Sequence, residues 1–444
     1  MDPSKPFPVV VPPTLKFDGN DGNWSTFFVN VGGPAHDYRL LPSTSSSVTW
    51  IPSANACVEG DPSNCPDTRG IQPFEGRIQG YQPTASNESI SLADHLWLEL
   101  DSVDLNVTYG PQYGDQVGWF YQDTVGLGPA QSTLNITEYR AVVAAIDTEE
   151  FWIGEFGLDL GPNKFQTPEP YPSYLSVLND SNLIPSLSYG YGAGAFYRNN
   201  GAYGSLTLGG FDSSRFETSR VMFPLGVNGL LQLAVADIQV SINDTPSSMT
   251  KDAAIFWAAI DSTLPYLWLP KNICDEFATT FGLTYDNTTN IYLVNSTAHA
   301  QNVANNATVM FSLAPSPTTS DFTSISLPYD AFDLELSWPA FEDPQSYFPI
   351  RRANGDKAVL GRTFLQEAYL IVDHERGNFS VNQAIYPYPP PATNIVPILR
   401  IEQSNPHTSK SHLSGGAIAG IVIGVVAFLG FLAGVAWFLY RRRR

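Results

Sequence analysis

Short segments of the chain alternate apolar and polar residues, a period of two that places every second side chain on one face of a β-strand. These segments are rich in β-branched and aromatic residues, and Gly, Pro, Asn or Asp bound them. The clearest lie at 27–33, 38–41, 48–52, 90–110, 204–211, 231–242 and 367–381. Helical patterns are short and few, and the best of them is 273–283, which follows Pro270. The pattern therefore predicts an all-β fold.

One segment near the C-terminus is apolar throughout. From Leu413 to Tyr440 it contains no charged residue, and roughly 20 apolar residues are enough to cross a bilayer as a helix. Trp437 and Tyr440 stand near its end, where aromatic rings favour the headgroup region, and four arginines follow at 441–444. We predict a single transmembrane helix over 413–440 in the lipid bilayer. A buried core helix and a glycolipid-anchor signal are the alternatives, and the second should not end in arginines.

Glycines are regularly spaced in this predicted helix. Gly416, Gly420 and Gly424 are four residues apart, a spacing that lets two membrane helices approach closely. The spacing predicts a homodimer through these transmembrane glycines. The alternative is that they serve only flexibility, because Gly is frequent in membrane helices.

The basic cluster also predicts the topology. Residues 441–444 should form a cytoplasmic tail, with everything before the helix extracellular or lumenal, in the cell membrane or an endomembrane. Residues 387–412 are rich in Pro and Ser and predict a partly extended stalk. Residues 1–14 read as an N-terminal extension without a visible secretory signal. Either a signal is missing from this chain, which we favour, or the protein inserts by its tail.

Composition and charge narrow the class of protein. A chain of 444 residues is long enough for two large lobes, and a charged content of 15% is low for a soluble domain. The formal net charge is −20. Such a surface repels phosphate backbones, so we expect no nucleic-acid partner. No Cys/His spacing indicates a metal site, and we predict no cofactor.

Cysteines and sequons agree with exposure outside the cytosol. Cys57 and Cys65 bracket a short polar loop that a disulfide could close, which leaves Cys274 either buried and inert or an unpaired thiol. The tripeptide for N-glycosylation is weak evidence at any one place, but here it recurs along the whole chain. The sequons lie at Asn23, Asn87, Asn106, Asn135, Asn179, Asn243, Asn287, Asn295, Asn306 and Asn378.

Two segments repeat each other. STSSSVTWIP starts at Ser43 and DSTLPYLWLP starts at Asp261, with Trp50 and Trp268 each seven residues further on. The repeat indicates an internal duplication, and chance similarity of short hydroxyl-rich pieces is the alternative. Only the second copy begins with an acid.

The flanks of both copies resemble the pepsin-like aspartic peptidase family. Residues 31–53 resemble its I-G-T-P…D-T-G-S-S…W-V-P-S pattern, and 258–270 resemble its A-x-x-D-T-G-T-S pattern. Further along, 152–158 are similar to F-D-G-I-L-G-L and 359–384 to I-L-G-D-x-F-L-R, while Tyr109 and Gly110 match the Tyr-Gly of the flap hairpin. The resemblance covers about 15–386 and is greatest to membrane-tethered members from filamentous fungi. It implies a bilobal β fold, with lobes at about 15–210 and 211–386.

The resemblance also implies what the repeat is for. Each lobe of this fold supplies one catalytic loop, here Thr44 and Ser45 after Ser43, and Ser262 and Thr263 after Asp261. In the family, one water is held between two carboxylates that share a proton, so that one acts as base and the other as acid. Ser43 replaces the first carboxylate.

Other departures surround that replacement. Ser45 and Thr263 stand where the family has glycine, and their side chains should crowd or re-aim the loops. Leu264 and Pro265 replace the hydroxyl residues that follow the second acid. Glu155 could supply another carboxylate, or it could be turned toward a polar partner or water. Asp37, on the strand that leads to Ser43, reads as a surface residue.

We therefore expect a membrane-anchored pepsin-like homologue without ordinary proteolysis. Its cleft would hold peptide, protein or glycan, and Asp261 would be the retained second-lobe acid. An active aspartic-type endopeptidase that uses Asp261 with an unorthodox partner is the rival hypothesis. A heavily glycosylated structural surface protein is the third.

Overall fold

A computed structural model of the chain describes residues 6–74, 77–95, 118–132, 136–149, 151–161, 163, 170–251, 253–355, 357–401 and 441–442. The chain divides into one compact unit, Met1–Arg400, and a second, Ile401–Arg444. Within the described residues, no helix is long and apolar enough to cross a membrane. The helix predicted at 413–440, with its glycines, lies outside the described residues.

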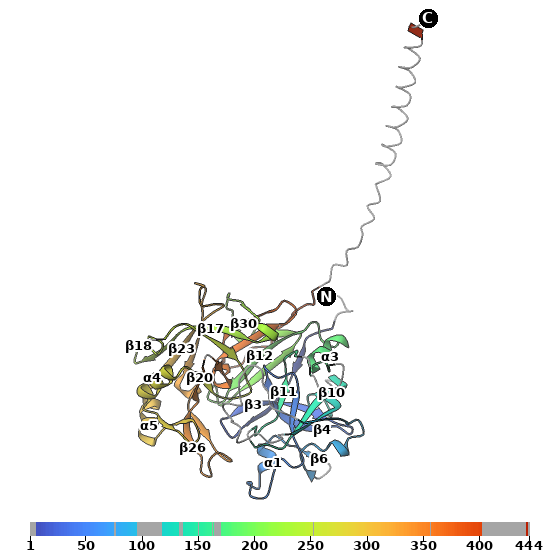
Figure 1. Cartoon of the computed structure of the whole chain (residues 1–444), viewed down its shortest axis with the longest axis horizontal. Helices are drawn as coiled ribbons and strands as arrows, with labels where there is room; N and C mark the ends of the chain where they lie inside the picture. The colour runs from blue at the N-terminus through green and yellow to red at the C-terminus, as the bar shows by residue number, and fades with distance from the viewer. Residues whose placement is uncertain are drawn as a thin grey trace. The chain divides into compact units, whose positions relative to one another are not determined.

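The N-terminal lobe is built on an eight-stranded sheet (Figure 1). Its order is β2 (Pro13–Asp18), β3 (Trp24–Val31), β4 (His36–Ser43), β11 (Glu155–Gly157), β5 (Thr49–Pro52), β10 (Ile136–Ile146), β9 (Gly118–Leu127) and β8 (Ile90–His95). A small hairpin adds β6 (Pro73–Phe74) and β7 (Arg77–Ile78). Near the centre of the sheet, β11 thus pairs parallel with the last three residues of β4, so that Ser43 lies opposite Gly157.

The C-terminal lobe repeats this plan. The main sheet runs β24 (Thr323–Pro328), β23 (Thr308–Ala314), β17 (Gln232–Ile242), β19 (Phe256–Ile260), β28 (Ala358–Leu360), β20 (Leu267–Leu269) and β27 (Ile350–Arg352), with β18 (Thr245–Ser248) beside β17. A second sheet runs β21 (Thr284–Asp286), β22 (Ile291–Leu293), β26 (Gln345–Phe348) and β25 (Leu334–Leu336).

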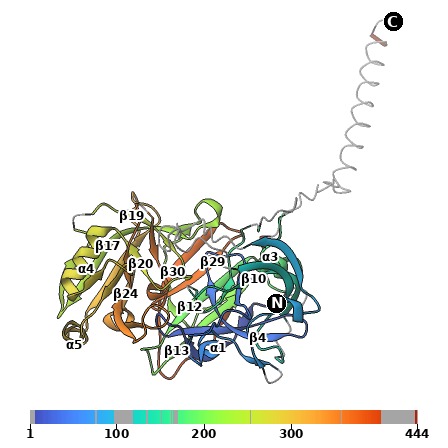
Figure 2. The same ribbon diagram turned by 60° about the horizontal axis from the view of Figure 1, so that its bottom comes forward.

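A third sheet joins the two halves of the chain. Its order is β1 (Val9–Val11), β13 (Ala202–Leu208), β12 (Ser188–Ala195), β29 (Ala368–Asp373), β30 (Asn378–Ala384) and β15 (Phe216–Glu217), and β16 (Phe223–Pro224) also pairs with β30. Figure 2 shows β12, β29 and β30 in the middle of the globular unit. Strands from both ends of the sequence are therefore needed to complete it.

The two copies of the repeat have the same strand pairing. β11 pairs parallel with β4 and antiparallel with β5, and β28 pairs parallel with β19 and antiparallel with β20. Trp50 and Trp268 are both buried in one apolar cluster, where the Trp50 ring meets Phe151 edge-on at 5.1 Å. The bilobal all-β fold that the resemblance implied is thus confirmed, and the repeated tryptophans share one buried apolar cluster.

Helices are few and short in the part of the chain that the structure describes, as the pattern predicted. They are α1 (Cys65–Thr68), α3 (Tyr174–Asp180), α4 (Lys271–Phe281), α5 (Ser296–Asn305) and α6 (Arg362–Leu365), with 3₁₀ turns at Pro83–Ala85, Val227–Gly229 and Tyr329–Ala331. Helix α4 is the segment expected after Pro270, and Gly282 ends it in the left-handed conformation. Cys274 is buried on its inner face, and burial raises the pKa of this thiol to about 12. Cys274 is therefore the buried, inert thiol, the first of the two alternatives that the sequence left open.

The ends of the globular unit extend further than the sequence indicated. β1 lies within the predicted N-terminal extension and pairs with β13. β31 (Ile395–Pro397) lies within the predicted stalk and pairs with β14 (Gly210–Asp212). Apolar residues of β31 thus add a strand to the unit, despite the Pro-rich sequence around them, and the unit continues to Arg400.

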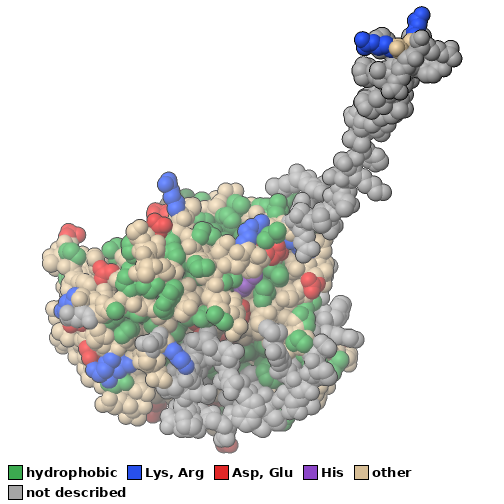
Figure 3. All heavy atoms as spheres, turned by 45° about the horizontal axis from the view of Figure 1, so that its top comes forward, with side chains coloured by type: hydrophobic (Ala, Val, Ile, Leu, Met, Phe, Trp, Pro, Cys, Tyr) green, Lys and Arg blue, Asp and Glu red, His purple; other side chains and the backbone are tan. Residues whose placement is uncertain are grey.

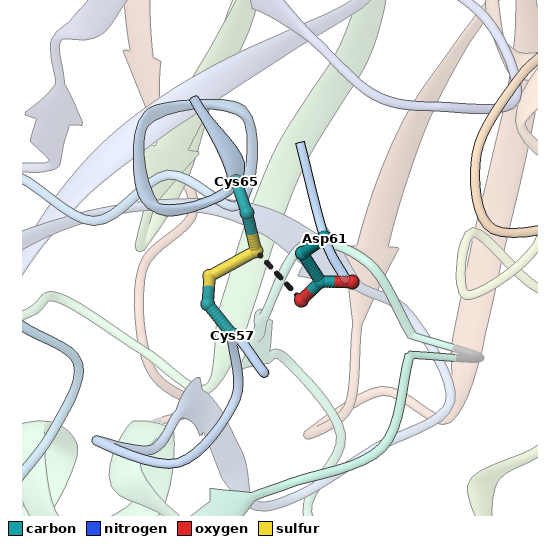
Figure 4. A group of neighbouring side chains, drawn as sticks. All are labelled: Cys57, Asp61 and Cys65. Carbon is teal, nitrogen blue, oxygen red and sulfur yellow. Dashed lines mark hydrogen bonds between the residues drawn. A yellow bond between two sulfur atoms is a disulfide. The ribbon is translucent and has the colours of Figure 1, made fainter. Parts of the chain in front are cut away.

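The predicted disulfide between Cys57 and Cys65 is present, with an S–S distance of 2.08 Å (Figure 4). Asp61 lies beside it, with Oδ2 3.4 Å from Cys65 Sγ. The three side chains are close enough to hold a metal ion, but both sulfurs are committed to the disulfide. Asp61 Oδ1 accepts a hydrogen bond from Trp338 Nε1 at 3.0 Å, which ties this loop to the C-terminal lobe.

Candidate active site

The two loops of the repeat meet back to back. Thr44 N donates to Ser262 Oγ (2.9 Å), and Ser262 N donates to Thr44 Oγ1 (3.1 Å). Each hydroxyl then donates across to the other lobe, Thr44 to Ile260 O at 3.3 Å and Ser262 to Pro42 O at 2.6 Å. The four hydrogen bonds are reciprocal, so both loops need a hydroxyl residue at this position. The clamp places Ser43 and Asp261 on facing sides of the interface between the lobes.

Ser43, at the end of β4, is fully buried. Its Oγ accepts a hydrogen bond from Ser46 N at 3.2 Å and lies 3.1 Å from Thr263 Oγ1. Asp261 follows β19 directly, and its backbone N donates to Leu360 O at 3.2 Å. The predicted pair of positions is therefore assembled, with a hydroxyl in place of one acid.

Ser45 and Thr263 fill the space between these two positions. Ser45 Oγ donates to Asp261 Oδ1 at 2.7 Å, and Thr263 N donates to the same oxygen at 2.9 Å. The hydroxyls of Ser45 and Thr263 are 3.1 Å apart. A continuous chain of hydroxyls thus runs from Ser43 through Thr263 and Ser45 to Asp261. The added side chains, which were expected to crowd or re-aim the loops, hydrogen-bond between the two positions while the loops remain joined.

Glu155 brings a second carboxyl group to this chain of hydroxyls. It opens β11, where it is paired with Leu41 on β4 and Trp50 on β5. Its side chain is buried, and Oε2 lies 3.4 Å from Thr263 Oγ1. Burial and the charge of Asp261 raise the pKa of Glu155 to about 8, although Arg362 and the hydroxyls oppose the rise. The sequence left open whether Glu155 turns toward a polar partner, and in the structure that partner is Thr263, inside the site.

Arg362 is a site residue that the sequence did not single out. Its Nη1 donates to the carbonyls of Ser262 (3.2 Å) and Thr263, and its Nη2 pairs with Asp21 Oδ2 at 2.7 Å. The guanidinium lies 4.9 Å from the Trp24 ring centroid. A signal was present, because Arg362 stands where the I-L-G-D pattern has its acid.

Other predicted residues lie elsewhere. Asp37 is half-buried and accepts a hydrogen bond from Ala130 N at 2.7 Å, away from the hydroxyl chain. The flap residues Tyr109 and Gly110 lie outside the described residues. The strands on either side of them, β8 and β9, form the antiparallel pair that a flap hairpin needs.

Comparison with known proteins agrees with this geometry. The family model described as "Eukaryotic aspartyl protease" matches residues 26–384. The chain belongs to this family. Within the aspartyl proteases it is 23% identical over 370 residues to secreted aspartic protease 8 of Candida albicans, covering 83% of this chain and 77% of that protein. It is 25% identical over 373 residues to the probable aspartic-type endopeptidase opsB of Aspergillus oryzae, covering 81% and 69%.

A solved structure shows the same fold. The aspartic proteinase from Irpex lacteus matches with a TM-score of 0.55 at 18% identity, covering 85% of this chain and 97% of that one. The aspartyl protease fold is therefore retained over nearly the whole globular unit. Within the site, the side chains at positions 43, 45, 155, 263 and 362 depart from the family's motif pattern.

The raised pKa of Glu155 makes a prediction about stability. The folded protein keeps a proton that an unfolded carboxyl, with a pKa of 4.5, releases. Stability from this group is full below pH 4.5 and is lost as the pH rises through 8, by about 1.4 kcal/mol per pH unit. Glu155→Gln removes the titration and keeps the size of the side chain. We expect its unfolding free energy to fall less than that of wild type between pH 5 and pH 8.

Urea unfolding of both proteins at pH 5, 6, 7 and 8 measures this difference. Glu217→Gln is the matched control, because Glu217 is exposed. Equal pH slopes for wild type and Glu155→Gln would show that Glu155 does not hold the proton.

Proposed function

We propose that this aspartyl protease homologue binds peptide in its cleft and lacks ordinary dyad-dependent proteolysis. The observation that carries the proposal is the hydroxyl of Ser43 at the place of the first acid, hydrogen-bonded into the chain of hydroxyls that ends on Asp261. A serine hydroxyl neither ionises near neutral pH nor takes a proton usefully. The site therefore lacks one of the two groups that acid–base hydrolysis requires.

The filled gap supports the same conclusion. The family's water lies between the two acids, and here the hydroxyls of Ser45 and Thr263 hydrogen-bond to each other and to the groups on either side. A water in that place would have to displace these hydroxyls and break the hydrogen bond from Ser45 to Asp261. The clamp between Thr44 and Ser262 is complete, so the two loops are held together across the lobes. A peptide is the favoured ligand over protein or glycan because the similar fungal proteins are named as proteases and an endopeptidase.

A second candidate function is an endopeptidase in which Glu155 replaces the missing acid. The supporting observation is that Glu155 and Asp261 lie at two ends of one short path through Thr263 and Ser45. The charge of Asp261 contributes to the raised pKa of Glu155, as expected of two acids that share a proton. The intervening hydroxyls weigh against this candidate, because they stand where the attacking water would.

The proposal makes a prediction about cleavage. The full chain should release no product from a randomised peptide library between pH 3 and pH 6, measured by mass spectrometry, and Asp261→Asn should behave as wild type. A general acid or base contributes about 10²–10⁴-fold each, so a working pair would be plainly visible. Cleavage that Asp261→Asn abolishes would contradict the proposal. If Glu155→Gln also abolished cleavage and the control Asp37→Asn did not, the second candidate function would be established.

Retention of the same library on immobilised full chain tests the binding half of the proposal. Enrichment of a subset of peptides is the expected result. No retention at any pH between 5 and 8 would contradict it.

We also propose that the protein is a single-pass membrane glycoprotein with its protease-like unit outside the cytosol. The apolar run at 413–440 and the arginines after it support this, as does the secreted nature named for the similar Candida protein. On the globular unit, the described Lys and Arg side chains visible in Figure 3 lie apart from one another, among uncharged and acidic side chains. That distribution fits the expectation of no nucleic-acid partner.

The sequons differ in exposure, which makes the glycosylation prediction specific. Asn179 is only 8% exposed, and its Oδ1 accepts a hydrogen bond from Arg400 at 2.6 Å. Asn378 is half-buried, and Asn106 and Asn135 lie outside the described residues. The exposed sites are Asn23, Asn87, Asn243, Asn287, Asn295 and Asn306.

Expressed behind a functional secretory signal, the full chain should lose mass on amidase deglycosylation. Peptide mapping should find glycans at exposed sites and none at Asn179, because a glycan there would have to displace Arg400. An unglycosylated chain would argue for the opposite topology. Full occupancy at Asn179 would contradict its packing against Arg400.

A further inference from the structure

A small pocket opens beside the chain of hydroxyls. The volume available to a water-sized sphere is about 20 Å³, which is enough for about one such group. Its walls include Trp24, Phe151 and Trp152, and its polar lining comes from Asp21, Glu155, Thr263 and Arg362. The half-exposed members of the lining belong to the turn at 19–21, so the pocket reaches the surface beside that turn.

Glu155 is the unusual member of this lining. A buried carboxyl is costly unless a cation pairs with it, and the family pattern has an apolar residue at this position. Arg362 acts on Glu155 from nearby, but it forms its ion pair with Asp21 and gives other hydrogen bonds to backbone carbonyls. Among the described residues, Glu155 thus accepts a hydrogen bond from the Thr263 hydroxyl and has the charge of Arg362 nearby, but forms no ion pair of its own.

The other charged groups around Glu155 would not neutralise its ionised carboxylate. Asp21 and Arg362 cancel each other at 2.7 Å. Asp261 adds a negative charge from the C-terminal lobe, and Tyr191 on β12 is a buried neutral phenol. With Glu155 ionised, the surroundings are net negative. The aromatic walls also favour a cation, because their faces are negative.

We propose that this pocket takes the primary ammonium of a lysine side chain in the bound peptide, with Glu155 as its countercharge. The inference rests on the proposed function, since it names the side chain that the peptide-binding cleft selects. The pocket holds about one water-sized group, and an ammonium is a compact charge of that size. The planar guanidinium of arginine is wider.

One further polar atom fits a peptide rather than a free amine. Arg362 Nε is buried without a hydrogen-bond partner in the described part of the chain. An ammonium offers no acceptor to this donor, but a backbone carbonyl of the same peptide does.

The mouth of the pocket is already held in place. Ser337 N donates to Asn20 O at 2.8 Å, and Asn20 Nδ2 donates to Trp338 O at 3.0 Å. Tyr347 OH donates to Asp21 O at 2.6 Å. These contacts fasten the turn at 19–21 to the C-terminal lobe, so binding needs little ordering of this turn.

The test compares three peptides of one scaffold, acetyl-Ala-Ala-X-Ala-Ala-amide, in which X is lysine, arginine or norleucine. Binding to the full chain in detergent micelles is measured by calorimetry. At pH 8 we expect the lysine peptide to bind at least about tenfold more tightly than either of the others. Its affinity should fall by up to tenfold per pH unit from pH 8 to pH 5, because Glu155 must lose its proton to bind a cation.

Calorimetry of wild type in two buffers of different ionisation enthalpy gives a measurement that needs no variant. We expect release of about one proton per lysine peptide bound at pH 6. Glu155→Gln should remove both the preference for lysine and its pH dependence, whereas the surface control Glu217→Gln should keep them.

The outcomes distinguish failure of the lysine pocket from failure of the proposed function on which it rests. Equal affinity for the three peptides, or no affinity for the lysine peptide, overturns the lysine pocket. Retention of the randomised library would then still support peptide binding. If the library is not retained either, the proposed function falls with the inference.

Discussion

The reciprocal hydrogen bonds between Thr44 and Ser262 are the constraint on which the rest of the site depends. Each backbone amide is held by the hydroxyl of the opposite loop, and each hydroxyl is anchored in turn to a carbonyl of the other lobe. Because all four bonds are buried, losing one hydroxyl would leave unsatisfied partners on both sides. This clamp fixes the distance between the two loops whatever side chains the neighbouring positions carry.

The neighbouring positions have changed while the clamp has stayed. The loss of an acid at Ser43 is accompanied by hydroxyls at Ser45 and Thr263, which satisfy Asp261 internally. Glu155 places a carboxyl beneath them, and Arg362 reverses the charge of the family pattern behind the second loop. The result is a polar site whose hydrogen bonds are made mainly among its own side chains. That arrangement favours holding a ligand nearby over activating a water between two acids.

Much of the fold could be predicted from local patterns. The repeated tryptophans, the period-two segments and the helix after Pro270 depend on neighbours in sequence, and the disulfide closes a short loop. The site needed long-range information. Arg362 pairs with Asp21, which lies 341 residues earlier in the sequence, and the orientation of Glu155 depends on where Thr263 lies. Apolar residues at 395–397 likewise add a strand that the Pro-rich composition around them concealed.

A hydroxyl-bearing transition-state mimic tests the central claim most directly. In a statine-type peptide, the inhibitor hydroxyl takes the place of the water between the two acids, and such mimics bind about 10²–10⁸-fold more tightly than substrates. Calorimetry should compare this peptide with its deoxy analogue on the full chain at pH 5. Because Ser45 and Thr263 fill that place, we predict affinities within about threefold of each other. A statine peptide that binds a hundredfold more tightly than its deoxy analogue would contradict the account.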